Sequence, residues 1–118
     1  MISNMEPKVK QAYLYDFYGE LLNAHQRKIF EDFVFNDLSL GEIAQEQEIS
    51  RQAVHDLVRR ATKKLEEYEQ KLHLLERFLR LREKAVCIQQ RAADYEQSQE
   101  PQLLAEIQEI SEEIIKEL

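Results

Sequence analysis

Residues 38–65 read LSLGEIAQEQEISRQAVHDLVRRATKKL, and this pattern predicts two helices joined by a tight turn. Ser39 is followed three positions later by Glu42, which is the spacing of a capping box at a helix start. Ser50 is placed to cap the second helix. Apolar residues then recur at helical spacing: Val54, Val58, Ala61 and Leu65. A short helix, a turn and a longer helix with a polar edge form a helix-turn-helix, whose second helix can enter a DNA major groove.

The same stretch carries a family resemblance. DLSLGEIAQEQEISRQAV, residues 37–54, resembles the helix-turn-helix of region four of bacterial sigma factors, which share the layout LSxxEIAxxxxISRxxV. With LYDFYGELLNAHQR before it and LEEYEQKLHLLERF after it, the chain is similar to the YlxM family, small sigma-like proteins of Gram-positive bacteria. The similarity covers residues 10–80. Because this family is usually encoded beside the signal recognition particle GTPases, the resemblance implies a role in signal-recognition-particle-dependent protein targeting.

The turn of the motif departs from the sigma pattern. Sigma-type turns usually place glycine where this chain has Glu48. A left-handed backbone at a residue with a side chain costs about 1 kcal/mol. Either the turn is less tight here, or its surroundings tolerate that strain.

Composition predicts an all-α protein without a membrane segment. The 118 residues include only two glycines and two prolines, and helix-forming residues dominate. The first residues, MISNMEPKVKQ, have no apolar core and do not form a signal peptide. No run approaches the ~18 apolar residues of a membrane span. A single cysteine, Cys87, fits a reducing compartment, so we expect a cytoplasmic protein.

Acidic charge is concentrated at the C-terminus. Residues 94–118 hold eight acidic residues against one lysine and so carry the whole net charge of −7. Residues 50–64, in contrast, hold five basic residues against Asp56 alone. A basic helix on a neutral body is compatible with a nucleic-acid partner.

The second helix of the motif supplies the candidate nucleic-acid-binding residues. Arg51 and Gln52 lie in its first turn, where a groove-inserted helix meets base edges and where Arg reads guanine and Gln reads adenine. His55 follows one turn later on the same face. The cations farther along are expected to contact phosphates. The complete set is Ser50, Arg51, Gln52, His55, Arg59, Arg60, Lys63 and Lys64.

Two residues of this helix favour a second hypothesis. Asp56 opposes phosphate binding, and Leu57 is apolar where sigma-like helices are usually polar. They suit a protein-interaction module that keeps a sigma-like fold and docks on a targeting protein or its RNA. An apolar patch around Leu57 and His55 would favour docking, and a basic surface would favour nucleic acid.

Two further helices are predicted before the motif. Asn23 and Gln26 form another capping box, so residues 7–22 and 23–36 are separate helices. Apolar stripes face the core from the first helix at Leu14, Phe17, Tyr18, Leu21 and Leu22, and from the second at Ile29, Phe30, Phe33 and Val34.

The second half of the chain predicts a long helix and a homodimer. No Gly or Pro interrupts residues 50–93, so we expect one helix of ~40 residues, followed by a last helix from Pro101 to Leu118. The apolar stripe of the long helix needs the first helix, the last helix or a second copy to cover it. We expect a helix-turn-helix domain over residues 1–65 and a dimerising extension over residues 66–118. The proposed dimer contacts are Leu65, Tyr68, Leu72, Leu75, Phe78 and Leu79.

No pattern of residues predicts catalysis. His25, His55 and His73 lie on separate segments without ligand-spaced partners for a metal. Gly19 and Gly41 are the only glycines, so a glycine-rich phosphate loop is absent. We therefore expect a regulator without cofactor, metal or enzymatic activity, which binds DNA, or RNA, as a homodimer.

Overall fold

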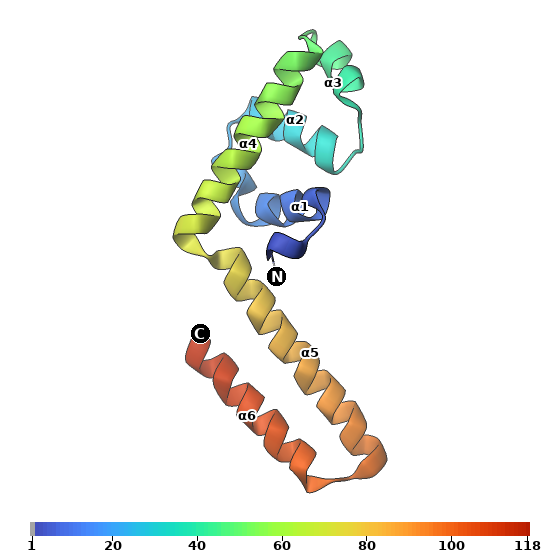
Figure 1. Cartoon of the computed structure of the whole chain (residues 1–118), viewed down its shortest axis with the longest axis vertical. Helices are drawn as coiled ribbons and strands as arrows, with labels where there is room; N and C mark the ends of the chain where they lie inside the picture. The colour runs from blue at the N-terminus through green and yellow to red at the C-terminus, as the bar shows by residue number, and fades with distance from the viewer. Residues whose placement is uncertain (1) are drawn as a thin grey trace. The chain divides into compact units, whose positions relative to one another are not determined.

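The computed structural model describes residues 2–118, and over these residues the chain is helical without a strand (Figure 1). This confirms the all-α class. Two 3₁₀ turns are present, η1 (Ile2–Asn4) and η2 (Gly19–Leu21). The α-helices are α1 (Pro7–Tyr18), α2 (Ala24–Val34), α3 (Leu40–Gln47), α4 (Arg51–Leu72), α5 (Leu74–Ser98) and α6 (Pro101–Glu117).

The helices of the motif begin where the capping residues predict. The Asn23 side chain accepts the backbone N–H of Gln26 at 2.8 Å, and the Gln26 side chain accepts that of Asn23 at 3.2 Å. Ser39 and Glu42 make the same reciprocal pair at 3.1 and 3.0 Å. The hydroxyl of Ser50 accepts a backbone N–H in the first turn of α4 at 3.0 Å. These contacts confirm all three predicted helix starts.

The turn between α3 and α4 is tight despite its lack of glycine. Glu48 is left-handed, with φ 57° and ψ 41°, and its N–H bonds to the carbonyl of Ala44. The N–H of Ile49 bonds to the same carbonyl at 3.1 Å, and its side chain packs against the core. The surroundings therefore tolerate a strain of about 1 kcal/mol.

Helix α4 is the centre of the first half of the chain, because α1, α2 and α3 all pack against it. Its buried face matches the predicted stripe. The apolar residues buried in this part of the chain are Leu14, Tyr18, Leu22, Ile29, Phe30, Ile43, Ala44, Val54, Val58, Ala61, Leu65 and Leu75.

The prediction that Leu21 belongs to the core is wrong. Leu21 is half-exposed, because α1 ends at Tyr18 and the 3₁₀ turn that follows rotates Leu21 away from the α-helical register. Phe17 is only partly buried.

The uninterrupted helix predicted from residue 50 to residue 93 is also wrong. His73 is left-handed, with φ 55° and ψ 27°, and separates α4 from α5. Neither Gly nor Pro marks this position in the sequence. The break is instead held by one residue of α4 itself and one residue of α1.

The contacts come from Tyr18 and Glu69, both of which are buried. The Tyr18 hydroxyl donates to the Glu69 carboxylate at 2.5 Å and accepts the N–H of Leu74 at 3.2 Å. The same carboxylate accepts the N–H groups of Leu75 and Glu76, each at 3.0 Å. Three unpaired donors at the start of α5 are thereby satisfied, which stabilises a helix start that the local sequence does not encode.

The network also predicts a pH dependence. Burial, and then the hydrogen bond to Glu69, raise the pKa of Tyr18 to about 12. A folded-state pKa above the ordinary value of 10.0 contributes stability that is fully present below pH 10 and is lost as the pH rises through about 12.

The prediction that His73 has no ligand-spaced partners is wrong, because Glu69 lies four positions before it and Glu76 three positions after it. Donor atoms of Glu69, His73 and Glu76 lie within 4.8 Å of one another, as metal ligands would. Both oxygens of Glu69, however, already accept backbone N–H groups of α5. Within this cluster, Glu69 therefore acts as a helix cap, and His73 contacts Glu76 at 3.2 Å.

The chain divides into two compact units, one ending at Glu76 and the other running from Arg77 to Leu118. The capping network explains why the first unit extends beyond Leu65, where the sequence analysis ended the helix-turn-helix domain. The dimerising role of the second half stays a prediction.

In the second unit, the rest of α5 and α6 form an antiparallel hairpin (Figure 1). Ion pairs join the two helices along their length, at Arg80–Glu117 (2.7 Å), Lys84–Glu113 (3.9 Å) and Arg91–Glu106 (3.1 Å). The predicted start of the last helix at Pro101 is confirmed.

Replacing Ser39 or Ser50 with Ala should lower the free energy of unfolding by about 1 kcal/mol each, because each change leaves a helix N–H without its acceptor. Urea denaturation followed by circular dichroism measures the loss. The matched control is Ser111→Ala in the interior of α6, which removes the same hydroxyl away from any helix start and should cost less. Equal stability of all four proteins would contradict the assigned caps.

Replacing Tyr18 with Phe should lower the free energy of unfolding by about 1–3 kcal/mol, because the buried Glu69 carboxylate loses a donor. Tyr68→Phe is the control, since it removes a hydroxyl from the neighbouring ring, 6.0 Å from Tyr18, without touching the network. If both variants unfold at the same urea concentration, the network does not hold the break at His73.

Candidate nucleic-acid interface

The orientation of α4 is set by its buried stripe. Because Val54, Val58, Ala61 and Leu65 face the core, the opposite side of the helix faces solvent. Ser50, at the N-cap, is exposed, and Lys64 is partly buried. The other predicted residues are all exposed: Arg51, Gln52, His55, Arg59, Arg60 and Lys63. The structure therefore brings the candidate residues together on one surface, which we call the α4 ridge.

The start of the ridge lies beside α3. Arg51, Gln52 and His55 share a shallow pocket with Leu40, the first residue of α3. The residues expected to contact bases therefore lie where α4 meets α3.

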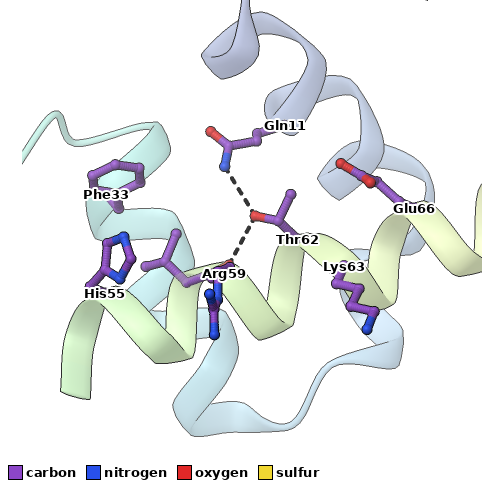
Figure 2. Close-up of a pocket in the computed structure, with 8 residues that line it drawn as sticks. Gln11, Phe33, His55, Arg59, Thr62, Lys63 and Glu66 are labelled. Atoms are coloured by element: carbon purple, nitrogen blue, oxygen red, sulfur yellow. Dashed lines mark hydrogen bonds between the residues drawn. The ribbon is translucent and has the colours of Figure 1, made fainter. Parts of the chain in front are cut away.

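A groove runs along one side of the ridge, between α4 and helices α1 and α2. Figure 2 shows His55, Arg59 and Lys63 on the α4 side of this groove, whose volume is about 370 Å³. Gln11 of α1 donates to Thr62 at 3.0 Å, and Thr62 donates to the Val58 carbonyl at 2.9 Å. The first bond joins α1 to α4, and the second, within α4, orients the Thr62 hydroxyl that receives it.

The N-terminal helices add residues that the sequence analysis missed. Gln11 and Phe33 line the groove, and the Lys8 ammonium lies 4.8 Å from the centre of the Phe33 ring. Periodicity predicted Phe33 only as a core residue, and nothing in the sequence indicated Gln11, because both reach the groove only through the packing of α1 and α2 on α4.

A second hollow, of about 350 Å³, lies on the other side of the ridge. Arg60 and Asp56 border it from α4, and Asn23 and His25 border it from the start of α2. Arg59 and Arg60 are adjacent in sequence and therefore border hollows on opposite sides of the ridge.

Asp56 places a negative charge inside this basic surface. Its carboxylate accepts the Gln52 side-chain amide at 3.1 Å and lies 3.7 Å from His55 Nδ1. The carboxylate thus occupies one of the two amide hydrogens of Gln52 and lowers the positive potential of the ridge.

Leu57 does not form an exposed apolar patch with His55. It packs against the hydrophobic core and lines the second hollow, whereas His55 lies beside the groove on the opposite side. From Arg51 to Lys63 the exposed residues of α4 are basic or polar, which is the observation that favours nucleic acid over protein docking.

The predicted dimer contacts differ in their exposure within one chain. Leu65, Leu75 and Leu79 are buried within a single chain. Tyr68 is partly buried beside Tyr18. Leu72 and Phe78 are exposed, by 53% and 42%.

Comparisons with known proteins agree with the geometry. A family model described as "Putative helix-turn-helix protein, YlxM / p13 like" matches residues 5–114. A UPF0122 protein of Bacillus pumilus is 40% identical over 102 residues, which cover 86% of this chain and 93% of the relative. A UPF0122 protein of a Thermoanaerobacter species is 44% identical over 102 residues, 86% of this chain and 87% of its own. One from Shouchella clausii is 51% identical over 74 residues, 63% of this chain and 68% of its own.

Replacing Asp56 with Asn should raise the affinity of the chain for nucleic acid several-fold at low salt, because a carboxylate no longer faces the phosphates. Fluorescence anisotropy with a labelled duplex and a labelled RNA hairpin measures the change. Asp16→Asn on α1 is the control, since it changes the net charge equally on another helix. An unchanged affinity in the Asp56 variant would place the contact surface elsewhere.

Proposed function

Because the chain belongs to the UPF0122 family of YlxM- and p13-like helix-turn-helix proteins, we propose that it is a regulator that binds nucleic acid through the α4 ridge. The single observation that carries the proposal is the exposure of six polar or basic residues on one side of a helix whose other side is buried. Arg51 and Gln52 would read base edges, and Arg59, Arg60 and Lys63 would contact phosphates.

The footprint of one chain is small. Five basic residues between residues 50 and 64 are opposed by Asp56, so the electrostatic contribution to binding is modest. Two chains held together would present two ridges to one duplex, and this makes a homodimer part of the proposal. The partner is DNA or a structured RNA, and the chain acts by recognition rather than by catalysis.

We further propose that this regulation serves the signal recognition particle pathway in the cytoplasm. This link comes from the resemblance to the YlxM family. Among the described helices, none combines the length and the apolar character that crossing a membrane requires.

Docking on a protein of the targeting pathway is the second candidate function. Asp56 favours it, because this carboxylate opposes phosphate at the centre of the ridge and ties up Gln52. A protein partner with a basic side chain opposite Asp56 would suit the same surface.

The experiment that separates the two is a titration at several salt concentrations. Replacing Lys63 with Ala should weaken binding to all sequences, because one phosphate contact is lost. The slope of log K against log salt concentration should then become less steep by about one. Replacing Arg51 or Gln52 with Ala should instead reduce the preference between sequences. Lys116→Ala, which removes an exposed lysine of α6, is the matched control.

If the wild-type chain shows no salt-dependent binding to any duplex or structured RNA, nucleic-acid recognition is excluded and docking on a protein takes its place.

A further inference from the structure

Part of the lining of the groove beside the α4 ridge is apolar, and a phosphate contact would leave it uncovered. Val58 of α4 is 6% exposed there, and Phe33 of α2 is partly buried. The volume of about 370 Å³ falls in the range of about 300–1,000 Å³ that is typical of small-molecule sites. A base stacked inside a duplex presents only its edge, so this lining fits a flat ring that has left the stack.

Gln11 adds a polar group with free bonding capacity to the same groove. Its side-chain amide donates one hydrogen to Thr62 at 3.0 Å. Among residues 2–118, none bonds to the amide oxygen or to the second amide hydrogen of Gln11. Figure 2 shows this oxygen turned away from Thr62. A fixed acceptor beside a fixed donor matches the hydrogen-bonding edge of an unpaired base, an edge that pairing in a duplex would occupy.

Two cations that border the groove remain available to a phosphate. Glu66, the acidic residue of the lining, lies 3.8 Å from Lys10, which balances its charge. Arg59 and Lys63 form no ion pair with any residue that the structure describes. Figure 2 shows their charged ends directed away from Gln11. The base-sized lining and the cations are therefore separate, as the base and the phosphate of a nucleotide are.

We propose that this groove holds one unpaired nucleotide from a loop or bulge of a nucleic acid. The base lies against Phe33 and Val58, with its edge on the Gln11 amide, and the phosphate contacts Arg59 and Lys63. Stacking on an aromatic ring is a common way for proteins to bind unpaired bases. The assignment rests on the proposed function, because it places one nucleotide of the ligand that the α4 ridge recognises.

A nucleotide suits the groove better than a side chain of a protein partner does. An acidic side chain would match the cations and leave the apolar lining uncovered. An aromatic side chain would match Phe33 and Val58 and leave the cations without an anion. A nucleotide joins a flat ring to a phosphate and so satisfies both parts of the groove at once.

Fluorescence anisotropy with matched probes tests the proposal. The probes are a labelled RNA hairpin with an unpaired loop, a DNA hairpin of the same sequence, and a blunt duplex with the same stem. The wild type should bind a hairpin about tenfold more tightly than the duplex, because one stacked base is added to the phosphate contacts. The two hairpins distinguish RNA from DNA as the source of the nucleotide.

Two variants of the groove should remove most of this preference and change the affinity for the duplex much less. Gln11→Ala removes the amide, and Phe33→Leu removes the aromatic ring while keeping an apolar side chain against the core. Circular dichroism checks that both variants fold. Gln70→Ala is the matched control, because it removes an exposed glutamine of α4 outside the groove and should keep the full preference.

Lys63→Ala separates this proposal from the proposed function, since it should weaken binding to hairpin and duplex alike. If it does so while Gln11→Ala and Phe33→Leu keep the hairpin preference, the ridge binds nucleic acid but the groove holds no base. Equal affinity of the wild type for hairpin and duplex would also overturn the groove site. Absence of binding to every probe would overturn both proposals and leave the groove to a protein partner.

Discussion

The burial of one side of α4 is the constraint on which the rest of the first unit depends. Val54, Val58, Ala61 and Leu65 lie against three helices, and this fixes the rotation of α4 about its own axis. With this rotation fixed, the polar residues between them lie on the opposite, exposed side of the helix. The same apolar spacing that forms the core therefore creates the α4 ridge, and a change that rotated α4 would disturb stability and recognition together.

The capping network at the end of α4 connects the helix break at His73 to the packing of α1. Tyr18 comes from α1, fifty-one positions before Glu69, and the pair satisfies the first N–H groups of α5. The left-handed His73 costs about 1 kcal/mol by itself. The packing of α1 on α4 is thus coupled to the place where the chain leaves its first compact unit.

Local signals made much of this fold predictable. Capping boxes at Asn23 and Ser39 and the cap at Ser50 gave the helix starts, and apolar spacing gave the buried side of α4. The break at His73 was not predicted, because the nearby Glu69 that caps α5 bonds in turn to Tyr18, which is distant in sequence. For the same reason the groove residue Gln11 was missed, and Leu65 and Leu75 were assigned to a dimer although a single chain buries them.

The central claim is that the α4 ridge is the surface that recognises nucleic acid. Titration of isotope-labelled protein with a short duplex or an RNA hairpin, followed residue by residue in ¹H–¹⁵N correlation spectra, tests it most directly. The account predicts that the largest shifts fall between Arg51 and Lys63, with further shifts at Gln11 across the groove. Shifts confined to α5 and α6, or none at all under saturating nucleic acid, would contradict it.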